Sequence, residues 1–376
     1  MRVFTIQQTA SFRHQTRMMF TKTHASRLLI ILLFALLISG CIKLTDKVER
    51  AKLLKTENAG QADLEKEVNR LAQINSMRAK MDLKFEDNSY AEIGLAEKYK
   101  TADGEVVIQR PANILLKVQI PIIKSDVAQM TSDGEKFRVA VLQDGGSGKY
   151  KKFVVGSNNA DYSALQENLN AMDLDDAKAI KQNVNAFANL RPQHFTDAML
   201  IRPIDTTKNF YVQSTILEDE QDLSVQKKSP LRRVLRGYYL LDELHKNDDG
   251  SLSVMRRFWF DRVGGIRLAR QQIFDSKGEI ESDITYGNTG NLSESSDYAN
   301  LPLRIEVTRP KEKYKMSLTY QSPASVSIGK NYPATAFVLE NSWGLEEVNL
   351  DEKLVQAKGR KGDTVMRQPE AKVQAQ

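Results

Sequence analysis

The sequence predicts an α+β fold in which a curled antiparallel sheet forms an incomplete β-barrel with a helical lid. A long series of segments with alternating apolar and polar residues runs from residue 77 to residue 341, and short turns join most neighbours. A helical stripe precedes this series, and one helix-like stretch, residues 161–190, interrupts it. An antiparallel sheet of this many strands tends to curl, and inserted helices can then cover its apolar concave face.

The first forty residues have the pattern of an export signal. Residues 1–40 contain five Lys or Arg and no Asp or Glu, and residues 28–38 are eleven consecutive apolar residues. Such a run suits the core of a signal peptide and is too short to span a bilayer. Because the basic region before this run is long, a start at Met18 or Met19 instead of Met1 stays open.

Cys41 is the single cysteine of the chain, and its context favours attachment of a lipid. A lone thiol cannot form an internal disulfide, and the four histidines are too scattered to complete a metal site. An apolar run also supplies no base for a catalytic thiolate. Residues 38–41, with the sequence ISGC, resemble the bacterial lipobox that precedes a diacylglycerol-modified cysteine. The alternative is a buried helix that ends in a cysteine by chance.

The charge of the mature chain gives no bulk electrostatic case for nucleic acid. The whole chain has a net charge of +6, but removing the five basic residues of the signal from 54 leaves 49, against 48 Asp and Glu. We therefore expect no nucleic-acid partner. With no disulfide available, packing has to stabilise a mature protein of about 336 residues.

The mature chain divides into a tether, a body and a tail. Residues 41–60 are polar and mixed in charge, which suits a flexible tether. Residues 61–350 hold the strand series and its helices, and we expect them to form a single half-barrel domain. Residues 351–376 are polar and rich in Lys, Gln and Ala, a composition that predicts a disordered tail.

A helix and then a strand should open the body. Leu64, Val68, Leu71 and Ile74 recur at helical spacing, with Asp63 as the expected cap. From residue 77 the period changes to two, and apolar residues alternate with charged ones, as in a strand with one wet face. Further strands are predicted at residues 92–99, 105–110, 113–121, 126–133, 136–143, 149–156, 199–204, 210–217, 237–245, 253–262, 266–275, 279–287, 301–309, 314–322 and 336–341.

The order of several short motifs resembles the LolA/LolB-like family, which comprises the periplasmic lipoprotein carrier and the outer-membrane lipoprotein receptor. A helix runs into the first strand over residues 64–87, a strand ends in QRP at 109–111, and another leads into SDG at 132–134. Residues 259–287 and 336–350 match the end of the family pattern. Each motif is short, so their order carries the resemblance, which covers roughly residues 61–156 and 255–350.

The resemblance implies an incomplete barrel whose apolar cavity takes lipoprotein acyl chains. Residues 161–190 would then be the lid or an enlargement of it. In the carriers, the arginine of the Arg-Pro step holds the lid through backbone carbonyls, and Arg110 stands at that position as a lid-latch candidate. The alternative is that Arg110 is exposed at a strand end. The body is larger than a carrier, and residues 205–245 have no counterpart in the family pattern.

Six side chains on the predicted apolar face are candidates to line such a cavity. They are Met81, Leu83, Phe85, Ile114, Leu116 and Val118. The same side chains would equally fill a dry core, because strand parity does not distinguish a cavity wall from packing. Both interpretations stay open at this point.

The sequence contains no pattern that indicates catalysis or a metal. Residues 145–149, GGSGK, lack the spacing of a phosphate-binding loop and suit a hairpin turn. The aspartates at residues 173–176 lack the EF-hand spacing, which favours a helix cap over a calcium site. His194 and His245 read as surface or packing histidines. We therefore expect no enzyme activity, no catalytic residue, no metal and no cofactor.

One basic cluster has two interpretations. Lys227, Lys228, Arg232, Arg233 and Arg236 lie close together, just before two tyrosines. They could contact anionic headgroups or a partner. They could also balance the acidic residues at 218–222 in a solvated loop, which is the preferred interpretation.

Together these features predict a lipid-anchored lipoprotein of the bacterial cell envelope. Ile42 follows Cys41 where many Gram-negative bacteria place aspartate as an inner-membrane retention signal, so the periplasmic face of the outer membrane is expected. The body would bind acyl chains, a lipid or a lipoprotein and take part in lipid or lipoprotein transport. Its partners would be the membrane, this hydrophobic ligand and an envelope protein. The alternative is a structural or assembly lipoprotein with a filled barrel and no cargo.

Overall fold

The computed structural model describes most of the chain after residue 50. The described residues are 51–87, 97–98, 101–120, 125–143, 151–160, 162, 192–294 and 298–356. The predicted signal, Cys41, the GGSGK turn and the aspartates at 173–176 lie outside this set. So does the predicted insertion at 161–190, with the exception of Tyr162.

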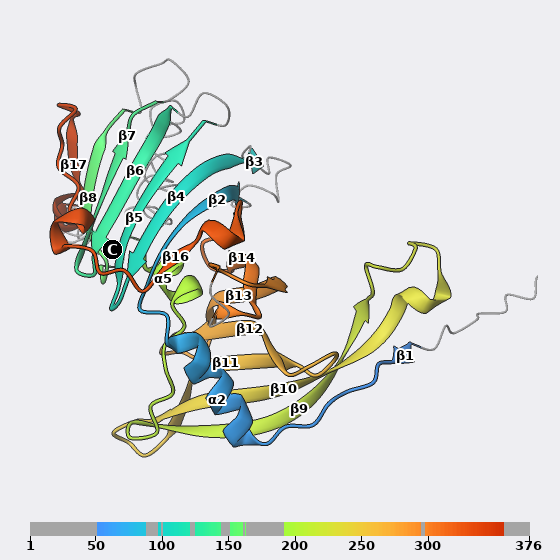
Figure 1. Ribbon diagram of the computed structural model, residues 1–376. Helices are drawn as coiled ribbons and strands as arrows, with labels where there is room; N and C mark the ends of the chain where they lie inside the picture. Colours follow the sequence, from blue (N-terminus) through green and yellow to red (C-terminus); the bar gives the residue numbers. More distant parts are fainter. Residues whose placement is uncertain are drawn as a thin grey trace, which may run out of the picture. The chain divides into compact units, whose positions relative to one another are not determined.

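Two antiparallel meanders make up the sheet, which has seventeen strands in the described part of the chain (Figure 1). The first meander contains β2 (Ser76–Asp87), β4 (Ala102–Gln109), β5 (Asn113–Gln119), β6 (Asp126–Asp133), β7 (Lys136–Val141) and β8 (Phe153–Ser157). The second contains β9 (Asn209–Gln221), β10 (Arg233–Lys246), β11 (Leu252–Asp261), β12 (Arg267–Phe274), β13 (Ile280–Gly290), β14 (Leu301–Arg309) and β15 (Tyr314–Tyr320).

Pairing between β2 and β15 joins the two meanders into one sheet, with Leu83 opposite Leu318. Short strands complete the sheet: β1 (Lys52–Leu53), β3 (Glu97–Lys98), β16 (Ser327–Ile328) and β17 (Glu347–Asn349). Among the described strands, β9 ends the sheet beside β10, and β17 ends it beside β8. The sheet is therefore curled but not closed, and the predicted incomplete barrel is confirmed.

The strand register explains why the core lies on one face of the sheet. Alternating residues of neighbouring strands stand side by side, so each predicted apolar face joins the next. In the second meander one such row contains Leu241, Phe258, Gln271, Ile284, Val307 and Met316, and it ends at Phe85 of β2. A corresponding row in the first meander contains Met77, Ile108, Ile114, Ser132 and Phe137. We call this continuous apolar surface the inner face.

Helices α2 and α5 lie against this sheet. In α2 (Gln61–Ala72), Leu64, Val68 and Leu71 are buried, as the helical stripe predicts, and Ile74 is buried just beyond its end. Asp63 is not the cap: Gly60 takes that position, and its N–H donates to the Asp63 carboxylate at 2.9 Å. Neither α2 nor any other described helix is long and apolar enough to cross a membrane.

The second helix, α5 (Pro192–Met199), has a proline at its first position, where its missing N–H leaves no hydrogen bond unmade. The strand predicted at 199–204 is wrong, since Met199 ends α5 and residues 200–205 have no regular secondary structure. The strand predicted at 336–341 is wrong as well, because a short 3₁₀ helix, η5 (Ala334–Phe337), lies there.

Both ends of the predicted body extend further than expected. Residues 51–60 are not a flexible tether, because β1 pairs with β10 and the Ala59 N–H donates to the Tyr239 hydroxyl at 3.3 Å. At the other end, residues 350–356 are helical, with Leu350 and Leu354 buried. Asp351 accepts a hydrogen bond from the Ser157 hydroxyl at 2.6 Å, which fixes this turn against β8. The remaining tail, from residue 357, lies outside the described residues.

Candidate functional site

An irregular segment crosses the inner face between α5 and β9, and we call residues 200–205 the strap. A segment without helix or strand leaves its backbone N–H and C=O groups unpaired, and buried groups of this kind need partners. In this protein, side chains from α2, β4, β9 and β11 provide those partners. The strap is therefore fixed to the sheet and to α2 by side chains, although it forms no element of its own.

Arg110, at the end of β4, connects the strap to α2. Its guanidinium donates to the carbonyls of Ala72 at 3.1 Å and Ile74 at 3.2 Å, both at the carboxyl end of α2. It also donates to the carbonyl of Ile201 in the strap at 2.6 Å. Partial burial lowers the pKa of Arg110, but a guanidinium stays protonated at neutral pH. Arg110 is thus bonded to backbone carbonyls, as the latch prediction requires, and those carbonyls belong to α2 and the strap.

Arg256 of β11 holds the next residues of the strap. Its guanidinium donates to the carbonyl of Arg202 at 3.1 Å and to that of Pro203 at 3.4 Å. The same group pairs with the carboxylate of Glu243, and both side chains are almost fully buried, at 4% and 6% exposure. Arg110 and Arg256 therefore bind three successive carbonyls of the strap.

The sequence contained a signal for the Glu243–Arg256 pair that our reading missed. Glu243 shares the parity of Leu241, and Arg256 shares the parity of Phe258, so both charges stand on the inner face. Two opposite charges at opposed apolar-face positions predict a buried pair. Glu243 also accepts hydrogen bonds from the Asn209 amide at 2.5 Å and from the Tyr211 hydroxyl at 3.2 Å.

Three further bonds complete the attachment of this region. The Ile204 N–H donates to the Asn69 side chain at 3.0 Å, and the Asp205 N–H donates to the Tyr211 hydroxyl at 3.0 Å. The Tyr286 hydroxyl donates to the carbonyl of Ala198 in α5 at 3.1 Å. Burial raises the pKa of Tyr286, so its hydroxyl remains a donor at any physiological pH.

The six cavity-lining candidates fall into two groups. Met81, Leu83, Ile114 and Leu116 are buried to within 1% of complete burial. Phe85 and Val118 are partly exposed, although they contact the same core. These two lie toward the carboxyl ends of β2 and β5. Arg110 lies at the other ends of these strands, where β2 and β5 begin. Of the six candidates, the two nearest the carboxyl ends of β2 and β5 are therefore the ones that stay partly exposed.

Leu83 shows how closely the buried group is packed. Gly104 stands on the neighbouring strand, and a Cβ built there would lie 2.5 Å from a Leu83 methyl carbon. The glycine therefore gives Leu83 the room to lie flat against β4. This part of the inner face is packed core.

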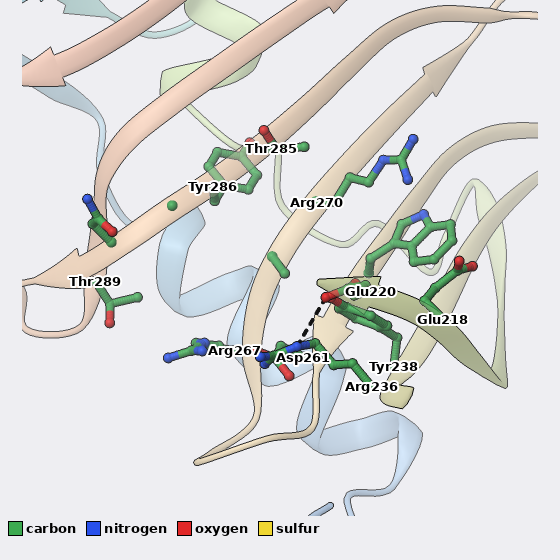
Figure 2. Close-up of a pocket in the computed structure, with 14 residues that line it drawn as sticks. Glu218, Glu220, Arg236, Tyr238, Asp261, Arg267, Arg270, Thr285, Tyr286 and Thr289 are labelled. Atoms are coloured by element: carbon green, nitrogen blue, oxygen red, sulfur yellow. Dashed lines mark hydrogen bonds and ion pairs between the residues drawn. The ribbon is translucent and has the colours of Figure 1, made fainter. Parts of the chain in front are cut away.

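A separate pocket of about 580 Å³ lies on the other face of the sheet, across β9 to β13. Figure 2 shows Arg236 beside Glu220 and Asp261, to which it is bonded at 3.2 and 2.8 Å. Small side chains on β12 and β13 form the hollow, and Arg270 stacks on Trp259 at 5.0 Å from the ring centroid. None of the six predicted cavity residues lines this pocket.

The histidines and the basic cluster have structural contacts. His194 is buried in α5 and hydrogen-bonded to the Tyr314 hydroxyl, which fits a packing histidine. Arg233 pairs with Asp219, and Arg236 pairs with Glu220, so these arginines balance acidic neighbours as the preferred interpretation states. In the described residues, no group of three or more His, Cys, Asp or Glu side chains is arranged to hold a metal ion.

Comparison with solved structures finds similarity at low sequence identity. A LolA superfamily protein from Nitrosomonas europaea aligns with 75% of this chain and 99% of its own, at 12% identity and a TM-score of 0.38. A DUF1329 family protein from Desulfovibrio piger aligns with 75% of this chain and 96% of its own, at 11% identity and a TM-score of 0.38. An outer membrane lipoprotein-sorting protein domain from Vibrio parahaemolyticus aligns with 73% and 96%, at 10% identity and a TM-score of 0.34.

These matches name the same family that the sequence motifs resemble. No family model matches the chain, and no curated protein matches it. Because the TM-scores lie below 0.5, the fold class rests on the strand pairings themselves, and the matches carry no argument about ligand or partner.

Proposed function

We propose that this chain is a lipid-anchored lipoprotein of the cell envelope, attached at Cys41, that binds acyl chains of a lipid or lipoprotein on its inner face. Its place would be the periplasmic face of the outer membrane, in lipid or lipoprotein transport. The proposal includes no enzymatic activity, no cofactor and no nucleic acid. The export pattern of residues 1–40 and the lipobox-like residues 38–41 support the anchor.

One observation carries the binding part of the proposal. Where β2 and β5 begin, Arg110 fixes α2 and the strap to β4 through three carbonyls. Toward the carboxyl ends of β2 and β5, which we call the open edge, the same apolar face continues to Phe85 and Val118. Both side chains stay partly exposed. An acyl chain that enters at that edge would cover these side chains and gain roughly 0.8 kcal/mol per buried methylene. The latch would hold the cover in place while the open edge admits the ligand.

A second function, a structural lipoprotein with a filled barrel, is favoured by a different observation. Met81, Leu83, Ile114 and Leu116 are already fully buried by protein, so that part of the inner face has no room for a ligand. If the rest of the inner face is filled in the same way, the protein would hold an envelope complex by its surface and carry no cargo.

A fatty-acid titration separates the two functions. The full chain with C41A, which cannot be lipidated, is titrated with a fluorescent sixteen-carbon fatty acid. We expect saturable binding that V118W weakens at least tenfold, because the larger ring blocks the open edge. The control is V212W, since Val212 is exposed on the other face of the sheet.

The titration has two outcomes that contradict acyl-chain binding. Equal affinities of V118W and V212W would remove Val118 from the binding surface. Absence of saturable binding in the C41A parent would favour the filled barrel. A V118T variant of nearly conserved size controls for misfolding, because it should also weaken binding while it keeps the circular dichroism of the parent.

A further inference from the structure

The chain enters the sheet at a defined end of β10. Strand β1 pairs with β10 in parallel, with Lys52 opposite Val234 and Leu53 opposite Leu235. Because the two strands run in the same direction, the start of β1 lies at the end where β10 begins. That end is the loop between β9 and β10, residues 222–232, which we call the hairpin tip.

The hairpin tip and β1 expose large apolar side chains. Leu223 is 79% exposed and Leu231 is 61% exposed, and Leu53 of β1, also 61% exposed, stands beside the base of the tip. Single exposed leucines are ordinary on a protein surface. The three exposed leucines near the start of β10 form an apolar patch, and exposure of such a patch to water is unfavourable.

Basic side chains surround these leucines. The hairpin tip contains Lys227, Lys228 and Arg232 against a single acidic residue, Asp222. Lys227 and Lys228 are exposed, while Asp222 already accepts hydrogen bonds from the backbone and hydroxyl of Ser224. Further along β10, Arg233 and Arg236 are neutralised by carboxylates.

Two more lysines, Lys52 and Lys55, are exposed on the entering segment. The unneutralised positive charge is therefore concentrated at the tip and beside it. Near an anionic lipid surface, each such lysine adds to the attraction.

The length of the chain restricts which end of the body can face the membrane. Lys52 is eleven residues after Cys41, a distance that an extended chain covers in at most about 40 Å. Strand β10 has 14 residues, so its far end, at the β10–β11 hairpin, lies roughly 43 Å beyond the tip end. A lipid at Cys41 therefore holds the tip end near the bilayer far more readily than the other end.

We propose that the hairpin tip docks on an anionic phospholipid surface. Leu223 and Leu231 enter the headgroup region, and Lys227 and Lys228 contact lipid phosphates. This inference rests on the lipid anchor of the proposed function, and it adds a second, protein-made contact that orients the body on the bilayer. The two contacts together resemble the paired signals that stable membrane attachment requires.

Site-specific labelling tests the orientation in the full lipidated chain. The native chain has one cysteine, which carries the lipid, so L223C introduces the sole reactive thiol. An environment-sensitive fluorophore on that thiol is followed in vesicles of phosphatidylethanolamine and phosphatidylglycerol that contain a headgroup quencher. We expect at least threefold stronger quenching than at L252C, the matched control. Leu252 is 55% exposed, at the far end of β10.

Charge reversal tests the electrostatic part without the lipid anchor. The full chain with C41A is floated with the same vesicles, and K227E/K228E should lower the bound fraction at least threefold. The control is K246E/K277E, which reverses two exposed lysines away from the tip. Vesicles of phosphatidylethanolamine and phosphatidylcholine, which lack anionic lipid, should bind neither protein.

The outcomes separate the tip from the anchor. Equal quenching at L223C and L252C on vesicles would overturn tip docking, and so would equal flotation of the two charge-reversal variants. If the tip binds another protein and no lipid, quenching will be equal at L223C and L252C. If mass spectrometry finds no lipid on Cys41 while the C41A chain still floats through its lysines, the anchor fails and the tip contact stands.

Discussion

The two meanders bury different chemistry on the same inner face. In the first meander the inner rows consist mainly of aliphatic side chains such as Ile114 and Leu116. In the second, the inner face also holds the Glu243–Arg256 pair and Gln271, whose side-chain oxygen has no hydrogen-bond partner among the described residues. The strap accounts for Arg256 on this face, because the backbone carbonyls of the strap need side-chain partners and Arg256 is one of them.

The comparison teaches that the buried Arg256 has a backbone segment to hold. Arg256 would be costly on an apolar face by itself, because burying a charge requires a partner and further hydrogen bonds. Glu243 supplies the partner, and the strap carbonyls take the remaining donors. In the first meander, Arg110 has the corresponding role at the end of β4. It binds a strap carbonyl while it stays partly exposed.

The largest effect is expected from breaking the buried pair. E243A leaves Arg256 charged and without its carboxylate, and it should lower the free energy of unfolding by about 3–5 kcal/mol. Chemical denaturation of the full chain with C41A measures the loss. D242A is the matched control, because the Asp242–Arg257 pair joins the same strands on the other, more exposed face. It should cost no more than about 1 kcal/mol.

A double substitution tests whether the loss of stability in E243A comes from the unpaired charge of Arg256. E243L/R256M removes both charges together and should recover most of the stability that E243A loses. Equal losses for E243A and D242A would show that the second meander does not depend on its buried charges.

Truncation in the first meander should produce the next largest effect. L116A removes three buried carbons from packed core and should cost about 2–5 kcal/mol, again by chemical denaturation. V118A truncates the next inner-face residue on β5, which is partly exposed, and should cost about 1 kcal/mol or less. If both variants lose the same stability, the open edge at Val118 is packed core as well.

Loss of the Arg110 contact should be smaller and local. R110K keeps the charge but cannot reach three carbonyls with one ammonium, so we expect a loss of about 1–3 kcal/mol. Hydrogen exchange should rise at residues 200–205 and at the end of α2, with little change in β9 to β13. Uniformly faster exchange over the whole sheet would contradict a local latch.

The smallest effect concerns an exposed pair outside both regions. Asp275 contacts Lys311, and that contact, together with backbone N–H donors, lowers the pKa of Asp275 from 3.8 to about 2. A carboxylate with a lowered pKa stabilises the fold above its unfolded pKa, and the contribution is lost as pH falls toward 2. The small difference in stability between wild type and D275N should therefore disappear between about pH 4 and pH 2. A difference that persists at pH 2 would exclude this ionisation as its source.

Much of the sheet could be predicted because its signal is local. Alternation in β2, β5 and β15 fixes which side chains point inward, and Gly-containing turns fix the short connections. Arg110 could be identified as a carbonyl-binding residue from the motif around it, although the resemblance placed its partners on the lid.

The features that were missed depend on long-range partners. Residues 199–204 read as a strand by composition, yet their backbone groups bond to side chains from distant elements. Residues 351–356 read as tail, because Leu354 is a weak apolar signal among polar neighbours. Strand β1 is two residues long, and its pairing with β10 leaves no periodicity to detect.

Native mass spectrometry of the full chain, purified from membranes in mild detergent, tests most directly whether the inner face binds acyl chains. We predict a bound species with the mass of a lipid or an acylated peptide, beyond the lipid on Cys41. It should be absent from V118W and present in V212W. A parent protein that repeatedly carries no such species, in preparations that retain the Cys41 lipid, would contradict acyl-chain binding.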